Sequence, residues 1–292
     1  MLSLHTNAAA LSTQNSLSST QKSLSTSMTR LGTGYRVNSA MDDAAGLQIA
    51  TRLDAQTRGM AVAQRNTQNG ISMLQTGEGA LTEVSNILLR MKDLATEAFS
   101  ASSTATDKTA MQNEYDALGT ELTNIVKNTS FGGTQLFSDG TTIDGSNGKM
   151  SAAMSFQIGA SAGETMSVDV STQLTALGTA LGAISTQYAA APAAGTELSA
   201  ATNALLTTIG TAVDRVGELR ASFGAAANRL DHVYNNLQNM STNTTAAKGR
   251  IMDTDFAAES STMTTKQMLL QSGTSMLKQS NSMSGLVMSL LG

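Results

Sequence analysis

The sequence has no cysteine, no tryptophan and one proline, and only 3% of its 292 residues are aromatic. Without cysteine the chain cannot form disulfides, use a thiolate nucleophile or bind zinc through sulfur. With so few aromatics it lacks the bulk that usually fills the core of a compact enzyme. The chain is still 40% hydrophobic and relies on alanine, leucine and methionine, a mixture that favours long helices in close contact.

Charge and motif content exclude further classes of protein. The formal net charge of −4 gives no attraction to nucleic acid or to an anionic membrane. The two histidines, His5 and His232, belong to no HExxH motif, so we expect no metal and no cofactor. No apolar run reaches the ~20 residues of a membrane span. The first residues lack the basic and apolar regions of a cleaved signal peptide, so we expect none.

Both ends of the chain repeat apolar residues every seven positions. Seven-residue spacing is typical of helices that coil around a partner. We therefore predict that the two ends form paired coiled-coil helices. The residues predicted to drive assembly are Leu17, Leu24, Leu31, Phe256, Met263, Leu270, Leu277, Met283 and Leu290. Leu269 and Met276 share the seven-residue line of Met283 and Leu290, beside that of Phe256.

Two interior segments carry the same repeat over a greater length. Between them, Met111 to Ile125 alternates steps of three and four between apolar positions. The pattern predicts three amphipathic helices, two of them long. Their core positions are predicted to be Leu53, Met60, Leu74, Leu81 and Leu88 in the first long helix, and Ile209, Val216, Phe223, Leu230 and Leu237 in the second.

The middle of the chain has a different period. Residues 131–149 are rich in Gly, Asp, Ser and Thr, which mark turns. Residues 154–170 alternate around a glycine-containing turn, as a β-hairpin would, and 171–200 read as a weak helix and loop. The fold class predicted is mainly α: an elongated antiparallel helical rod of the coiled-coil type with a small β-hairpin region. A helix of ~50 residues is ~75 Å long.

The paired carboxylates of the chain fit helix ends better than catalysis. Asp42 and Asp43 follow Ser39, which we predict to cap the next helix, and both favour its positive end. No histidine or nucleophile nearby completes an acid–base site. Asp253 and Asp255 have the same interpretation at the start of the last helix. We therefore predict no catalytic residues.

The two ends also need a partner. Ordering a helix costs backbone entropy, and the apolar residues of the ends offset that cost only when they are buried. Packing the two ends against each other buries one face of each. We therefore predict that the ends are frayed in an isolated copy and become ordered on self-assembly.

Several long segments resemble one family, the bacterial flagellins. The N-terminal segments are "STQNSLSSTQKSL", "TRLGTGYRVNSAMDDAAGLQIATRL" and "NTQNGISMLQTGEGALTEVSNILLRMKDLATEA". The C-terminal segments are "VGELRASFGAAANRLDHVYNNL", "AAKGRIMDTDFAAESSTMTTKQMLLQSGTSMLKQSN" and "SLLG". The resemblance covers about 1–135 and 201–292, and "FQIGASAGETMSVD" is similar to the family's hairpin. The outer domains that many flagellins insert in the middle are essentially missing.

The resemblance implies a division of the chain. Residues 1–44 and 251–292 would form the inner D0 layer, with the N-terminal joint at the end of the first range. Residues 45–138 and 201–250 would form the helices of the D1 layer, and 139–200 the hairpin and variable outer segment. It also implies an extracellular filament subunit for motility, exported unfolded through the flagellar type III apparatus without a cleaved signal peptide and polymerised at the tip.

The resemblance implies partners as well. These are many identical subunits, the flagellar cap and junction proteins, and a cytosolic export chaperone at the C-terminus. A host Toll-like receptor reads D1 in this family, and Arg90, Leu94 and Glu114 stand at the receptor-contacting positions. Leu89 replaces a usual glutamine, and Lys92–Asp93 replaces an Arg–Glu pair. We therefore expect recognition at reduced strength.

Two other functions remain open at this stage. One is a hook–filament junction protein, which shares terminal coiled coils with the flagellins. The other is an exported membrane-active protein, although basic and aromatic residues are scarce at both ends. An enzyme is not expected, because the short middle segment has no HExxH motif.

Overall fold

The computed structural model describes residues 7–138, 147–188, 195–199 and 203–291, with side chains as far as residue 282. Contacts divide the chain into two compact units. The central unit is Arg58–Ser241, and the terminal unit is Met1–Thr57 together with Thr242–Gly292. Both divisions fall inside continuous long helices, whereas the boundaries predicted at 44/45 and 250/251 lie near the ends of those helices.

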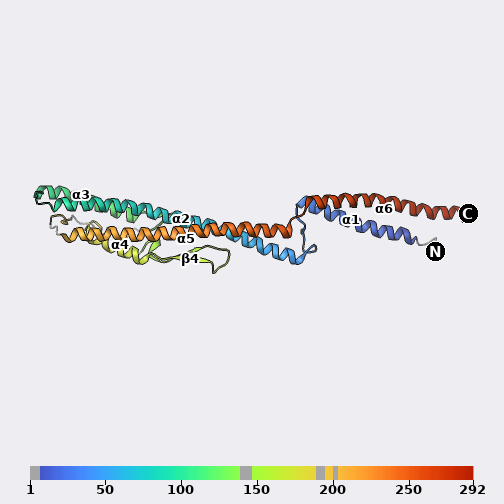
Figure 1. Ribbon diagram of the computed structural model, residues 1–292, viewed down its shortest axis with the longest axis horizontal. Helices are drawn as coiled ribbons and strands as arrows, with labels where there is room; N and C mark the ends of the chain where they lie inside the picture. The colour runs from blue at the N-terminus through green and yellow to red at the C-terminus, as the bar shows by residue number, and fades with distance from the viewer. Residues whose placement is uncertain (1–6, 139–146, 189–194, 200–202, 292) are drawn as a thin grey trace. The chain divides into compact units, whose positions relative to one another are not determined.

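The chain is mainly α, with small two-stranded sheets, as predicted (Figure 1). The structure describes the side chains of the predicted assembly residues, except for Met283 and Leu290, which lie outside the described side chains. Asn7 caps the first helix. The helices are α1 (Ala8–Thr33), α2 (Ala44–Ala98), α3 (Ala105–Asn128), α4 (Ser171–Ile184), α5 (Asn203–Met252) and α6 (Phe256–Leu291), with a 3-10 turn at Lys149–Ser151.

Within the central unit, α2 and α5 lie side by side and run antiparallel (Figure 1). Gln64 donates to Gln238 over 3.0 Å, and further along Glu78 faces Arg220. The seven-residue apolar lines of both helices turn inward because that repeat keeps one stripe of a helix facing its partner. Nine of the predicted core residues are buried: Met60, Leu74, Leu81, Leu88, Ile209, Val216, Phe223, Leu230 and Leu237. The tenth, Leu53, is only half-buried and belongs to the terminal unit.

In the core of the central unit, Gly77 stands at a close approach that requires glycine. The rings of Phe137 and Phe223 stack, with centroids 6.4 Å apart and planes 8° from parallel. Gly77 on α2 faces this stack, and a β-carbon there would lie 2.9 Å from Phe223 Cε2. Both rings are fully buried. The absence of a side chain at Gly77 therefore lets α2 approach α5 and its aromatic neighbour.

Two hairpins complete the central unit. Strands β3 (Met154–Gln157) and β4 (Thr165–Val168) pair antiparallel with Met154 opposite Val168 and Phe156 opposite Met166. These four side chains share one face because side chains alternate along a strand, and they pack into the core. The hairpin predicted within 154–170 is confirmed. A shorter hairpin, β1 (Ser130–Phe131) and β2 (Thr134–Gln135), turns at Gly132 and Gly133, which both have positive φ.

The helix ends correct one prediction and confirm another. Ser39 does not cap α2: Asp43 stands directly before Ala44, and its Oδ1 accepts a hydrogen bond from Gly46 N at 2.8 Å. Ser39 instead joins a turn in which Asp42 accepts bonds from two backbone amides. The predicted role of Asp255 is confirmed, since it accepts from Ala257 N and Ala258 N at the start of α6.

Candidate assembly surface

The two terminal helices form an antiparallel pair (Figure 1). Asn7, just before α1, donates to the carbonyl of Ser280 over 3.0 Å. At the other end of the pair, Arg30 lies 3.6 Å from Glu259. Between them Gly273 of α6 faces Leu17 of α1. The chain therefore brings its two ends together along most of the length of α1.

The seam of this pair uses the predicted apolar lines. Leu24 is buried, and Leu17 and Leu31 of α1 are half-buried. The α6 residues at the same spacing are half-buried too: Met263, Leu270 and Leu277. Phe256, at the head of that line, is exposed, although its ring reaches Gly34. The pairing accounts for one face of each helix.

A second apolar line on α6 stays uncovered. Leu269 is 51% exposed and Met276, one heptad later, is 64% exposed. Met268, next to Leu269, is 58% exposed. We name Met268, Leu269 and Met276 the α6 apolar line. On α1, Leu11 and Met28 are exposed as well. Large apolar side chains in such a concentration indicate a surface that another molecule covers.

Burial differs sharply between the units. Among the described residues, the terminal unit buries only Leu24, Val37 and Ala50 of its apolar residues. The central unit holds one large apolar cluster contributed by four helices and both hairpins. A unit that buries this little apolar surface gains little stability from its own packing. The terminal unit therefore gains less stability from its own packing than the central unit does.

The segments that join α1 to α2 and α5 to α6 also lie together in the terminal unit. Gly34 ends α1 with φ of 77°, a left-handed conformation that glycine adopts without strain. Tyr35 and Asp253 then form an isolated β-bridge. Backbone bonds run from Arg36 N to Met252 O and from Thr254 N to Gly34 O. These bonds hold the start of α6 beside the end of α1 and so set the register of the pair.

The predicted receptor positions do not form one surface. Arg90 on α2 and Glu114 on α3 make an exposed ion pair, with both Nε and Nη2 donating to Glu114 Oε1 at 2.9 and 2.7 Å. Leu94 is only 2% exposed and belongs to the core. Its side chain supports the helix from inside and offers no surface to a partner in this conformation.

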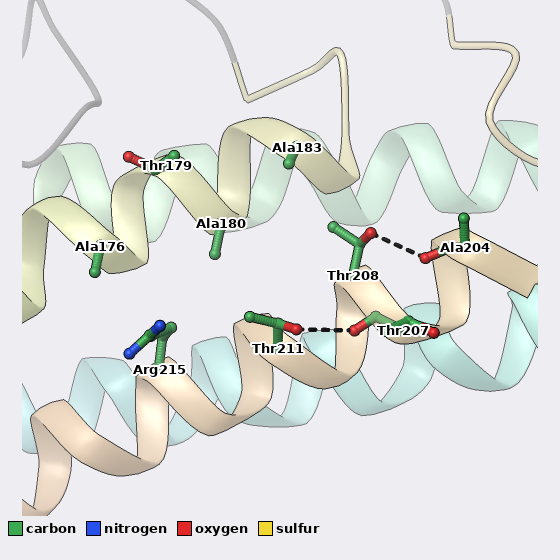
Figure 2. A pocket seen from close by; sticks show the side chains of 9 residues that line it. All are labelled: Ala176, Thr179, Ala180, Ala183, Ala204, Thr207, Thr208, Thr211 and Arg215. Atoms are coloured by element: carbon green, nitrogen blue, oxygen red, sulfur yellow. Dashed lines mark hydrogen bonds between the residues drawn. The ribbon is translucent and has the colours of Figure 1, made fainter.

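A groove lies between α4 and α5 (Figure 2). Its volume is about 720 Å³, and its walls are alanines and threonines with Arg215 at one end. The hydroxyls of Thr208 and Thr211 bond to the backbone of Ala204 and Thr207 in their own helix. Arg215 pairs with Glu218. The side chains that line the groove present mainly methyl groups. They include no acid–base pair, and no base that could activate a threonine hydroxyl as a nucleophile.

Among the described carboxylates, Asp42 has a structural role in a turn. Hydrogen bonds from the backbone of Ser39 and Asn38 lower the pKa of Asp42, which makes it a turn acceptor. In the part of the chain that the structure describes, no group of three His, Asp or Glu side chains is placed to hold a metal ion. None of the described helices is long and apolar enough to span a membrane.

One buried polar cluster was missed by sequence reasoning. Gln112 on α3 donates to Asp116 and Glu197, 2.8 Å from each, and accepts from Leu198 N at 2.7 Å. Glu197 in turn accepts from the backbone and hydroxyl of Thr186. No pattern in the sequence connects residues 112 and 197. The cluster fastens the segment 195–199 and the end of α4 to α3.

These features define a class: a mainly helical protein with a well-packed centre and two paired ends that leave apolar surface uncovered. The family models agree with it. The bacterial flagellin N-terminal helical region matches residues 4–142, and the bacterial flagellin C-terminal helical region matches 206–291. The matches together span most of the chain, which therefore belongs to the flagellin family.

Individual relatives support the same assignment. The chain is 43% identical to polar flagellin F of Vibrio parahaemolyticus over 60% of its own length and 44% of the relative's. It is 43% identical to flagellin C of Vibrio cholerae over 58% of its length and 42% of the relative's. The matched region thus spans less than half the length of these curated relatives. Among solved structures, Bacillus cereus flagellin is 34% identical, with a TM-score of 0.46, covering 63% of this chain and 94% of that one.

Proposed function

We propose that the chain is a structural subunit that polymerises with identical copies into the bacterial flagellar filament. The observation that carries the proposal is the α6 apolar line, left uncovered by the α1–α6 pair in a segment that matches the flagellin family. A homopolymer supplies the missing cover without a second gene product. The same surface explains why the terminal unit buries so few of its own apolar residues.

Seeded growth tests the proposal. Purified chain is added to short filament seeds, and the products are imaged by electron microscopy. We expect long tubes with a repeating lattice from the full chain and none from a chain that lacks residues 256–292. Tubes of normal length from the truncated chain would refute the proposal. A short cap of subunits that stops growing would indicate a hook–filament junction protein.

Point variants identify the surface responsible. Leu269→Glu with Met276→Glu places two charges on the α6 apolar line and should abolish growth, because a buried charge without a partner is costly. Thr264→Glu with Gln271→Glu is the matched control, since both positions are exposed on α6, seven residues apart and already polar. It should grow at close to the rate of the unmodified chain. Equal loss in both variants would exclude the apolar line as the specific contact.

The route to the filament is also part of the proposal. The chain is exported unfolded through the flagellar type III apparatus, after a cytosolic chaperone has shielded the C-terminal helix. It is added at the tip beneath a cap protein and is extracellular once in place. Absence of disulfides and the sparse burial in the terminal unit favour such a route, because little must be undone before export. Co-purification of the chaperone with the full chain but not with the chain lacking 256–292 tests it.

We further propose that a host Toll-like receptor recognises the exposed pair Arg90 and Glu114. The two side chains hold each other in place, so loss of either also frees the other. A cell reporter assay should give a weaker signal for Arg90→Ala than for the unmodified chain. Arg215→Ala is the matched control, because Arg215 is also a partly exposed arginine paired with a glutamate. Equal signals from the two variants would contradict the assignment.

A further inference from the structure

Methionine is the chain's only sulfur-containing residue type: seventeen methionines stand against no cysteine. Oxidants that reach the chain therefore meet thioethers and no thiols. A two-electron oxidant such as hydrogen peroxide converts methionine to the sulfoxide, a polar group, at a rate that depends on exposure. Where the accessible methionines lie decides what such oxidation would change.

The described methionines separate by unit. Six are buried, and all six belong to the central unit: Met60, Met73, Met91, Met150, Met154 and Met166. Five described methionines are exposed, and four of them belong to the terminal unit: Met28, Met41, Met268 and Met276, with Met240 in the central unit. The packed core is thus shielded, and the accessible sulfur is concentrated in the unit that lacks cover.

Two of the exposed methionines lie on the α6 apolar line itself. Met268 is next to Leu269, and Met276 is one heptad beyond Leu269. Both methionines are more than half exposed. A sulfoxide at either position adds a strong hydrogen-bond acceptor to a surface that is apolar. Covering that acceptor with another copy's apolar residues would leave it without a donor, which disfavours the contact. In a polymer the same penalty recurs at every subunit.

We propose that Met268 and Met276 are oxidation sites, and that their conversion to sulfoxides prevents the terminal unit from associating with other copies. In the reaction the sulfur lone pair attacks one oxygen of hydrogen peroxide and the O–O bond breaks. The new S–O bond forms, and the released hydroxide takes the remaining proton and leaves as water. Sulfur loses two electrons, and the peroxide gains them. The effect on association rests on the proposed polymerisation, but the selectivity of oxidation does not.

The first measurement maps the sites. The unpolymerised full chain is treated with a limiting amount of hydrogen peroxide, and its peptides are analysed by mass spectrometry over time. Peptides with Met268 and Met276 should gain one oxygen well before those with Met91 and Met150, which have no exposed surface. Equal rates for the two groups would overturn the proposal.

The second measurement asks whether these two sites control association. Peroxide-treated unmodified chain should lose at least tenfold in seeded growth. Treated Met268→Leu/Met276→Leu should keep its untreated rate, because leucine has similar volume and cannot be oxidised. Met41→Leu is the control: Met41 is 97% exposed but lies outside α1 and α6, so its treated form should fail as the unmodified chain does.

Each remaining outcome has a consequence. If the treated double variant loses growth as fully as the unmodified chain, other residues are responsible and the proposal is wrong. If the double variant fails to grow before treatment, the two single leucine variants are compared instead, and each must resist peroxide better than the unmodified chain. If untreated, unmodified chain does not grow, the proposed function fails, and the mapping alone decides whether the two sites are selective.

Discussion

At the scale of single residues, the best-defined polar contact of the core is that of Tyr115. Its ring is fully buried, and its hydroxyl donates to the carbonyl of Ile184 at 2.7 Å. The bond ties α3 to the end of α4, and burial raises the pKa of the phenol far above its usual value. The hydroxyl therefore stays protonated and remains a donor.

Tyr115→Phe should lower the free energy of unfolding by about 1–3 kcal/mol, because the Ile184 carbonyl is left without its donor. Urea unfolding followed by circular dichroism measures the change. Tyr35→Phe is the control, since Tyr35 is exposed and should shift stability by no more than about 0.5 kcal/mol. Identical curves for the two variants would show that the Tyr115 hydroxyl contributes nothing.

Glu197 is the second informative residue. Burial raises the pKa of its carboxyl, but hydrogen bonds from Thr186 and Gln112 outweigh this, so the pKa is lowered below the ordinary 4.5. A carboxyl whose pKa is lowered in the folded state stabilises the fold at pH values above its pKa in the unfolded chain. That stability is lost as the pH falls through its pKa in the folded state. Glu197 should therefore add to stability at neutral pH and contribute progressively less below about pH 4.5.

The prediction is that Glu197→Gln lowers stability at pH 7 by about 1 kcal/mol and flattens the fall in stability between pH 5 and roughly pH 3. Thermal or urea unfolding at several pH values measures both effects. Glu121→Gln, a change at an exposed position on α3, should leave the pH profile unchanged. A Glu197→Gln profile parallel to that of the unmodified chain would exclude the carboxylate as the acid-sensitive group.

At the scale of secondary-structure elements, two glycines on α2 separate helix propensity from packing. Gly77 faces Phe223 so closely that a β-carbon would lie 2.9 Å from its ring, whereas a β-carbon at Gly79 meets nothing within 4 Å. The two residues lie two positions apart in the same helix, so helix propensity affects them alike.

Gly79→Ala should therefore stabilise the chain by up to about 1 kcal/mol, the usual gain of alanine over glycine inside a helix. Gly77→Ala should destabilise it by about 1–3 kcal/mol, because Phe223 is held by Phe137 and cannot yield without strain. Thermal unfolding distinguishes the signs. If both variants are stabilised, α2 and α5 do not approach as closely as described.

The sequence was sufficient to predict the helices that carry a sustained seven-residue repeat. It was not sufficient to predict the residues at which those helices begin. The heptad lines located α2, α5 and the terminal helices because burial selects one stripe over many turns. For the start of α2 the sequence predicts Ser39 as the cap, since Ser and Asp are both good caps. Only the geometry shows that Asp43 accepts the capping hydrogen bond. The Thr104–Asp107 capping box at the start of α3 is a local signal of a helix start that the sequence does contain.

Contacts between distant residues were beyond prediction for a physical reason. The ion pair of Arg30 with Glu259 depends on the register of α1 against α6, and a repeat of seven fits several registers equally well. The bond of Gln112 with Glu197 depends on where the segment 195–199 lies against α3, which no local pattern specifies. The burial of Leu94 is a further example: the family position indicates a contact, but only the packing of α2 shows that its side chain faces inward.

At the scale of the whole molecule, the main finding is the contrast between its two units. The central unit closes a large apolar cluster within one chain. The terminal unit pairs its helices but leaves the α6 apolar line uncovered. Fold class and family could be predicted from the sequence. The residues that stay exposed after α1 and α6 pair could not be predicted, because either apolar line of α6 has the spacing to pack against α1.

The two units of one chain should therefore behave differently. Helices stabilised mainly by contacts with a partner should open easily when the partner is absent. The central unit should be equally stable in a free copy and in a polymer. The terminal unit should gain its order on association.

Amide hydrogen exchange, read by mass spectrometry on free chain and on polymer, tests this most directly. In the free chain, amides of 8–33 and 256–291 should exchange rapidly while the central unit, around Leu81 and Val216, stays protected. In the polymer, both should be protected. Full protection of the two terminal helices in the free chain would contradict the account, because one copy would then need no other to order its ends.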